Sequence, residues 1–218
     1  MSENGQVVDA DEASFCSKHE KTLGSHLALE VFRSLHSDRK RLAVVDYAVA
    51  KPTEVDAQGL LVLATLLADR LKKATSAKRV GIVLPPGVGG VVANLAVVFA
   101  DKVPVNLNFS LGRAAVESSI DRAGIDLLLS AEKIRAKLKD FPWIPGYLDV
   151  GTALEEIRGS KLRLMCRALV LALPCGLAGS LLNIPRNGGD SEAGLLFTSG
   201  SSGMPKGVAL SHRNLLSN

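Results

Sequence analysis

The amino-acid sequence predicts an α/β fold in which a mainly parallel sheet is covered by helices on both faces. Short β-rich apolar runs alternate with helical segments, which is the pattern of consecutive βαβ units. One helical segment, residues 88–100, is nearly all apolar, so it should be buried on more than one side. Aromatic residues make up 4% of the 218 residues and hydrophobic residues 47%, so the core must be mainly aliphatic.

The first elements are predicted from apolar spacing. Residues 27–35 have the periodicity of a short helix, and residues 42–47 form a β-rich run. Thr53 with Asp56 three residues later resembles a capping box, and it should open a long helix over residues 55–73. The leucines of that segment recur at helical spacing, so we expect an amphipathic helix.

Strands and helices then alternate. Residues 79–84 form a strand that Pro85 ends, and residues 103–107 form the strand that follows the apolar helix. Ser110 is the expected N-cap of a further helix that runs through Ala123.

The next segment continues the same pattern. Residues 125–129 form a strand, and Ser130 should cap the short helix behind it. Two prolines make residues 141–147 an irregular connection, after which Thr152 and Glu155 form a capping box for another short helix.

Composition and the chain start limit the class of protein. A net charge of +4 without a basic stripe interleaved with aromatic residues argues against nucleic-acid binding. Cys16, Cys166 and Cys175 are too few and too irregularly spaced for a disulfide framework or a metal site. Residues 1–22 lack the features of a secretory signal and are predicted to be a loose terminus, with residues 23–218 forming one domain. A cytoplasmic location is the default expectation.

The strongest functional signal is the stretch Thr198-Ser199-Gly200-Ser201-Ser202-Gly203-Met204-Pro205-Lys206-Gly207, which apolar runs flank on both sides. It predicts a strand, a loop of small residues and a second strand. The glycines allow close approach of the backbone to a ligand, and successive backbone N–H groups in such a turn bind anions. Four hydroxyls and one lysine add donors and positive charge, so the stretch suits a polyphosphate.

Two other interpretations compete with this one. The common phosphate loop requires Gly-Lys-[Ser/Thr] and a following helix, whereas here Pro205 precedes Lys206 and a strand follows. A flexible Gly/Ser linker would explain the composition but neither the flanking strands nor the Pro-Lys-Gly exit.

This stretch, with Leu210-Ser211-His212-Arg213-Asn214-Leu215-Leu216 behind it, closely resembles the phosphate-loop signature of the AMP-forming adenylating superfamily. That superfamily includes acyl-CoA synthetases, acyl-acyl-carrier-protein synthetases, luciferases and peptide-synthetase adenylation domains. Ser202 departs from it, since many members carry Thr there. The strands and helices between residues 79 and 138 also resemble the N-terminal subdomain of these enzymes. The resemblance therefore implies that the chain is an incomplete, N-terminal part of an adenylating-enzyme fold.

The resemblance implies a two-step reaction. A carboxylate attacks the α-phosphate of ATP to give an acyl-adenylate and pyrophosphate, and a thiol of coenzyme A or of an acyl carrier protein then takes the acyl group. The family pattern assigns the β- and γ-phosphates to Thr198, Ser199, Ser201, Ser202 and Lys206, with Gly200, Gly203 and Gly207 allowing close approach. Mg²⁺ would bridge the phosphates, but no carboxylate of this sequence is an evident metal ligand.

The histidines and the acidic residues near the loop are weaker candidates. A histidine follows the second strand in the family and lies near the acyl substrate, which makes His212 a possible catalytic residue. A structural histidine at this position is an equally good interpretation. His19, His26 and His36 receive no role, and Asp190 and Glu192 are interpreted as parts of an ordinary loop.

An apolar insert, residues 160–184, precedes the loop. Its uncharged part, residues 168–182, is too short for a membrane-spanning helix, and Pro174 should interrupt it. A buried core helix, an interfacial helix and one wall of an acyl-chain channel all remain open. The basic residues Arg158, Lys161, Arg163 and Arg167 would suit a solvated face, an acidic carrier protein or a membrane surface.

Insert and loop together resemble the acyl-acyl-carrier-protein synthetase and 2-acylglycerophosphoethanolamine acyltransferase branch, with long-chain acyl-CoA synthetases as near neighbours. The resemblance implies a fatty acid or related carboxylate as substrate, and a location that is cytoplasmic or peripheral to the inner face of the membrane. Later parts of the family pattern, including the adenine-binding residues and the C-terminal lid lysine, are not found before Asn218. We therefore expect that these 218 residues alone bind ATP and Mg²⁺ weakly and do not complete adenylation. The alternative function is a non-catalytic nucleotide-binding or lipid-binding module.

Overall fold

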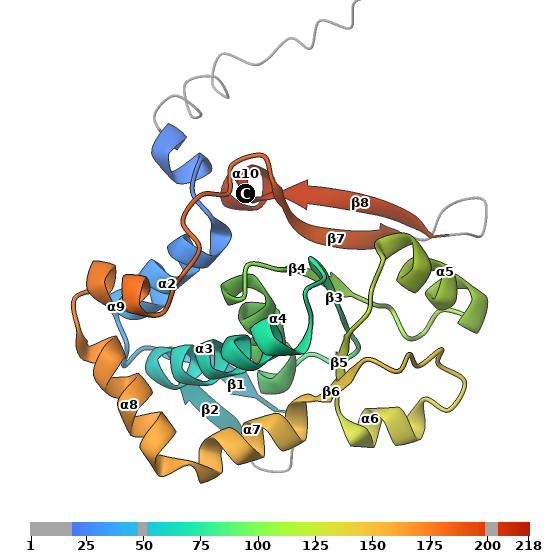
Figure 1. Cartoon of the computed structure of the whole chain (residues 1–218), viewed down its shortest axis with the longest axis horizontal. Coiled ribbons are helices and arrows are strands. Elements are labelled where there is room, and N and C mark those ends of the chain that lie inside the picture. Colours follow the sequence, from blue (N-terminus) through green and yellow to red (C-terminus); the bar gives the residue numbers. More distant parts are fainter. Residues whose placement is uncertain (1–18, 48–51, 199–204) are drawn as a thin grey trace, which may run out of the picture.

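The computed structural model describes residues 19–47, 52–198 and 205–218, and a four-stranded parallel sheet lies at its centre (Figure 1). The strands lie in the order β4-β3-β5-β6, and they are β3 (Arg79–Ile82), β4 (Val103–Asn106), β5 (Leu128–Ser130) and β6 (Tyr147–Asp149). From β4 the chain crosses over β3 to reach β5, so the strand order reverses between β3 and β5. This is the topology of a doubly wound α/β sheet.

One face of the sheet is covered by the largest apolar cluster. Helices α3 (Ala57–Ala74) and α4 (Val88–Phe99) form its centre, and α2 (Leu27–Ser37) and α7 (Val150–Gly159) extend it. Alternate strand residues, including Val80 and Ile82, point into this cluster. Helix α4 packs against α3 and β3, which confirms that this apolar helix is buried on more than one side.

The opposite face carries the second cluster. It includes Val103 and Val105 of β4, and helix α5 (Arg113–Ala123) contributes Val116 and Ile120 to it. Helix α6 (Glu132–Lys137) borders the cluster through the partly buried Ile134. With helices on both faces of a parallel sheet, the predicted fold class is confirmed.

A two-stranded ribbon precedes the sheet and fixes the start of α4. Strand β1 (Leu42–Asp46) pairs in antiparallel fashion with β2 (Thr53–Asp56). The Asp46 carboxylate accepts a hydrogen bond of 3.0 Å from the Val88 N–H. Gly87, just before α4, has φ of +146°, and a Cβ there would lie 2.6 Å from Asp46 Oδ2. Residue 87 must therefore be glycine, because a side chain there would collide with the Asp46 carboxylate that caps α4.

The predicted capping box at Thr53 is wrong. Thr53 lies in β2, opposite Asp46, and α3 begins only at Ala57. Asp56 is the N-cap, and its carboxylate accepts a 2.7 Å hydrogen bond from the Gly59 N–H. Residues 53–56 form a strand ladder with β1, the strand just before them, and the helical pattern of the segment does not contain this pairing.

Two serine caps are also wrong. The Ser110 hydroxyl donates to Asn108 Oδ1, and α5 begins three residues later without a side-chain cap. The Ser130 hydroxyl is fully buried and donates across the sheet to the Val83 carbonyl, 2.7 Å away. In both cases the hydroxyl bonds to a partner outside the following helix, so the helix starts elsewhere.

The start of α7 differs from prediction in the same way. Asp149, not Thr152, is its N-cap, and the Asp149 carboxylate accepts a hydrogen bond from the Thr152 N–H. The predicted irregular connection over residues 141–147 ends in the short strand β6, which pattern reasoning missed. Only pairing with β5 makes these three residues a strand.

The apolar insert forms two helices, α8 (Lys161–Ala172) and α9 (Cys175–Leu181), and Pro174 interrupts them as predicted. Helix α8 lies against α3, and α9 lies against α2 and α8, at the left of Figure 1. Within the three described ranges, no helix has the length and apolarity needed to cross a bilayer.

The chain ends in a hairpin of β7 (Glu192–Thr198) and β8 (Lys206–Ser211), followed by helix α10 (His212–Leu216). This confirms the two strands predicted around the loop. At the other terminus residues 1–18 lie outside the described part, but residues 19–23 are helical and Leu23 is buried. The prediction of a loose segment through residue 22 is therefore wrong for its last residues, because Leu23 and its neighbours pack against the domain.

Gly146 offers a test of the sheet. A Cβ at this position would lie 1.8 Å from the Asp126 carbonyl oxygen, and the Gly146 carbonyl accepts a hydrogen bond from the Leu128 N–H. We expect Gly146→Ala to lower the free energy of unfolding by about 2–4 kcal/mol, because β5 and β6 must separate to admit the methyl group. Urea denaturation measures this. Gly159→Ala is the matched control, since a Cβ there meets nothing within 4 Å. Equal unfolding midpoints for the two variants would contradict the prediction.

Candidate functional site

The β7–β8 hairpin holds both ends of the small-residue loop (Figure 1). Its last cross-strand pair is Thr198 and Lys206, so the loop leaves and returns at neighbouring positions. The predicted phosphate-binding residues between them, Ser199, Gly200, Ser201, Ser202 and Gly203, lie outside the described residues.

Thr198 and Lys206 are the described ends of the predicted site. Both side chains are exposed, and the Thr198 hydroxyl donates to the Lys206 carbonyl at 3.4 Å. A hydroxyl and an ammonium group therefore stand together where the loop begins and ends. These are suitable donors for an anionic oxygen.

Gly207 has a structural reason to be glycine. It lies opposite Phe197, and a Cβ there would approach the Phe197 ring to 3.3 Å and Leu195 to 3.4 Å. Both apolar side chains pack against the cluster under β4 and α5. Because Gly207 has no side chain, β8 can pass close to Phe197 and Leu195 while both residues stay packed on the domain.

Two arginines fasten the hairpin to the parallel sheet. Arg79 of β3 holds the Glu192 carboxylate through two nitrogens, with Nη2 to Oε2 at 2.9 Å and Nε to Oε1 at 3.0 Å. Arg122 of α5 donates to the Pro205 carbonyl at 2.8 Å. One arginine thus holds the start of β7, and the other holds the last described residue before β8.

The same arginines border a surface pocket of about 290 Å³ beneath the hairpin, lined also by Leu195, Phe197, Gly207 and Ala209. The interpretation of Glu192 as part of an ordinary loop is therefore wrong. Its partner lies 113 residues earlier in the chain, and no local signal in the sequence connects them.

His212 occupies a buried position behind the hairpin. Its Nδ1 accepts a hydrogen bond of 3.0 Å from the Leu27 N–H at the start of α2. The ring lies 3.8 Å between centroids from the ring of His26, at an angle of 43°, and His26 Nδ1 accepts from the Ala28 N–H. Two histidines together thus satisfy backbone donors of the first turn of α2.

Burial shifts the titration of this pair. Burial first, and then the positive charge that His26 can carry, lower the pKa of His212 to about 4. Burial also lowers the pKa of His26, although Asp101, whose Oδ1 lies 3.2 Å from His26 Nε2, opposes that shift. At neutral pH His212 is therefore a neutral acceptor. Its suggested place beside the acyl substrate stays a prediction.

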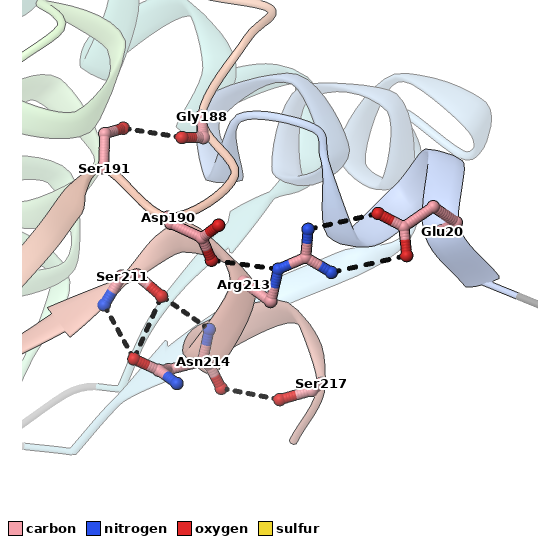
Figure 2. Close-up of polar contacts among 8 residues, drawn as sticks. All are labelled: Glu20, Gly188, Asp190, Ser191, Ser211, Arg213, Asn214 and Ser217. Carbon is pink, nitrogen blue, oxygen red and sulfur yellow. Dashed lines mark hydrogen bonds and ion pairs between the residues drawn. The ribbon is translucent and has the colours of Figure 1, made fainter. Parts of the chain in front are cut away.

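Arg213 ties α10 to two other segments (Figure 2). Its Nε donates to Asp190 Oδ1 at 3.0 Å, and Nη2 donates to Glu20 Oε1 at 3.1 Å. These hydrogen bonds, that of Glu20 first, raise the pKa of the Arg213 guanidinium above its usual value. Asp190, interpreted from the sequence as an ordinary loop residue, thus helps to hold the helix behind the hairpin.

Helix α10 also carries a capping box. The Asn214 N–H donates to the Ser211 hydroxyl, and Asn214 Oδ1 accepts from the Ser211 N–H (Figure 2). Local and long-range polar contacts therefore hold α10 in place at the end of the hairpin away from the loop.

The described residues do not form a metal site. Within residues 19–47, 52–198 and 205–218, no group of three or more His, Cys, Asp or Glu side chains could hold a metal ion. The hydroxyl and the ammonium group present at the hairpin suit a phosphate, and the ammonium group has no lone pair to offer Mg²⁺.

Comparison with known proteins identifies one matching family and several relatives. The sequence model of a family described as AMP-binding enzyme matches residues 32–218. A 4-coumarate–CoA ligase-like protein of Oryza sativa is 28% identical over 180 residues, which are 79% of this chain and 30% of that protein. The AMB antimetabolite synthetase AmbE of Pseudomonas aeruginosa is 31% identical over 173 residues, which are 76% of this chain and 7% of that synthetase. The chain thus spans less than a third of either relative.

Solved structures share the fold. VinN superimposes with a TM-score of 0.66 at 20% identity, covering 88% of this chain and 47% of VinN. The N-terminal subdomain of NpsA from Klebsiella oxytoca, in complex with 3-hydroxybenzoyl-AMSN, superimposes with a TM-score of 0.61 at 18% identity. That match covers 86% of this chain and 41% of the NpsA chain.

The histidine pair predicts acid sensitivity. An unfolded histidine titrates near 6.5 but folded His212 near 4, so between these pH values the unfolded chain binds more protons. The free energy of unfolding should therefore fall as the pH drops from about 6.5 to about 4, by on the order of 1–3 kcal/mol from His212. His212→Asn keeps an acceptor for the Leu27 N–H but cannot titrate, so it should reduce this dependence. Urea denaturation across this pH range measures it.

His212→Ala separates the two effects. It leaves the Leu27 N–H without its acceptor, so it should cost about 1–3 kcal/mol already at pH 7. A His212→Asn variant that keeps the whole acid dependence of the unmodified chain would refute the assignment.

Proposed function

The chain belongs to the AMP-binding enzyme family, and from this premise we propose that it supplies the N-terminal part of an ATP-dependent, AMP-forming fatty acyl ligase. The observation that carries the proposal is the β7–β8 hairpin, which brings Thr198 and Lys206 together on either side of a loop rich in glycine and hydroxyl residues. We propose that this loop binds the β- and γ-phosphates of ATP.

The chain's own residues would act by positioning charge. The Lys206 ammonium group would hold a phosphate oxygen, and the hydroxyls of Thr198, Ser199, Ser201 and Ser202 would donate further hydrogen bonds. The Arg79–Glu192 pair at the start of β7 and the Arg122–Pro205 contact before β8 would keep the hairpin in place on the domain when nucleotide binds. Such fixed donors need little reorganisation when charge shifts during the reaction.

ATP would supply the chemistry of activation. A carboxylate oxygen of the substrate forms a bond to the α-phosphorus, the bond between the α- and β-phosphates breaks, and pyrophosphate leaves. A thiol of coenzyme A or of an acyl carrier protein would then displace AMP from the acyl carbon. No metal-dependent step is assigned to the described residues, because they offer no fitting ligand set.

A fatty acyl substrate is the finer part of the proposal. It is supported by the apolar insert of α8 and α9, which comes just before the hairpin in the sequence and places leucines at the surface. The relatives named above carry other substrate names, which belong to those proteins. The branch of acyl-acyl-carrier-protein synthetases remains part of this proposal.

Pyrophosphate exchange tests the reaction. The 218-residue chain, and the longer product if the reading frame continues past Asn218, would be incubated with ATP, labelled pyrophosphate and one carboxylic acid at a time. We expect fatty acids to support exchange in a competent protein, and aryl and amino acids not to. Exchange with amino or aryl acids alone would overturn the fatty acyl assignment, and its absence with every acid in the longer product would overturn the ligase assignment.

Lys206 tests the nucleotide site directly. In ¹⁵N NMR spectra of the 218-residue chain, millimolar ATP should shift the amide signals of residues 198–207. Lys206→Ala should weaken ATP binding by about tenfold, because one charge-assisted contact is lost. Lys133→Ala removes an equally exposed lysine from α6 and is the control. Shifts confined to other regions, or equal affinities for the two variants, would place the nucleotide elsewhere.

A further inference from the structure

Helix α8 is apolar on two opposite faces. One face packs against the domain through Leu171, which is fully buried, and through the half-buried Leu164 and Ala168. The outward face consists of residues at helical spacing, and none of them is charged or strongly polar. They are Leu162, Met165, Cys166 and Leu169, and all four are exposed.

Helix α9 continues this exposed apolar surface. Leu177 and Leu181, one helical turn apart, are each about half exposed. Leu181 lines a surface pocket of about 320 Å³ together with Arg163, Cys166 and Val170 of α8. The five large apolar side chains of the two helices are exposed by between 51% and 67%. We call this surface the α8–α9 face.

Basic residues flank the apolar stripe. Lys161 and Arg163 are the neighbours of Leu162 in the sequence, so they lie about 100° to either side of it around the helix. Five basic residues and no acidic residue occur from position 157 to position 189. Arg167 pairs with Asp69, but within the described ranges neither Lys161 nor Arg163 forms an ion pair.

From this arrangement we propose that the α8–α9 face binds the surface of a membrane that contains anionic lipids. A helix with leucines pointing outward and basic residues on its flanks lies in the plane of the interface, with the leucines among the acyl chains and the cations at the headgroups. At about 18 Å, α8 is shorter than the roughly 30 Å hydrocarbon core, which suits this in-plane orientation.

Charge and apolar area together favour lipid over an acidic protein. An acidic protein surface would pair with Lys161 and Arg163, but it would place carboxylates beside the exposed leucines between them. An anionic bilayer offers phosphates at the level of the cations and hydrocarbon directly below. The pocket between the two helices, with Arg163 and three leucines in its lining, suits one lipid phosphate with the first carbons of a chain.

This inference does not rest on the proposed ligase chemistry. It concerns the α2–α3 side of the domain, whereas the loop lies on the hairpin that packs against the other apolar cluster. A protein that binds no ATP could still bind lipid here, so failure of the nucleotide-binding test leaves this proposal standing.

Vesicle sedimentation with the 218-residue chain tests the proposal. We expect partitioning onto vesicles of phosphatidylcholine with about one third phosphatidylglycerol to exceed that onto pure phosphatidylcholine by at least about tenfold, because two flanking cations act near the surface. Binding should weaken as salt is raised. Lys161→Gln with Arg163→Gln should remove most of the preference for anionic lipid.

Matched apolar variants complete the test. Leu162→Glu with Leu169→Glu should reduce binding to anionic vesicles by at least about tenfold, because carboxylates would enter the interface. Leu42→Glu changes a leucine that is half exposed on β1 and is not part of the α8–α9 face, and it should bind like the unmodified chain. Circular dichroism would check that each variant is folded.

Three results would overturn the proposal. The first is absence of the chain from the pellet with anionic vesicles at low salt. The second is equal loss of binding in Leu42→Glu, which would show that α8 is not the contact. The third is a lipid-free dimer, seen by light scattering, that the Leu162→Glu/Leu169→Glu variant converts to a monomer, since that would assign the face to a second copy of the chain.

Discussion

The attachment of one β-hairpin to a parallel sheet controls the whole candidate site. Within the described residues β7 and β8 pair only with each other, so no backbone ladder joins them to β4. The hairpin is held instead by side chains: apolar packing of Leu195 and Phe197, the Arg79–Glu192 pair, and the contact of Arg122 with Pro205. These contacts act at separate points along the hairpin, and together they position it on the domain.

The histidine pair makes a second connection of the same kind. His212 and His26 accept hydrogen bonds from the first turn of α2, so the end of the described chain is joined to its beginning. A buried donor without an acceptor would be costly, and a neutral imidazole supplies that acceptor. The contact therefore links the position of the hairpin to the protonation state of a buried ring.

The two proposed functional surfaces belong to opposite faces of the central sheet. The hairpin packs on the cluster formed by β4 and α5, whereas α8 and α9 pack on α2 and α3. The hairpin that bears the proposed nucleotide loop and the helices that bear the α8–α9 face thus pack on different apolar clusters of one domain. A ligand at one surface need not displace residues at the other.

Local patterns in the sequence determined the fold class, most helices and strands, the break at Pro174 and the phosphate-loop signature, because these depend on spacing and on residues close in the chain. They failed where a residue bonds outside its own segment: Thr53 pairs with Asp46 of the preceding strand, Ser130 bonds across the sheet, and Glu192 binds an arginine 113 residues away. The sequence also left three interpretations of the insert open: a buried core helix, an interfacial helix and one wall of an acyl-chain channel. Only the tertiary structure decided which face of α8 the domain covers, because that depends on where α2 and α3 lie rather than on the helix's own residues.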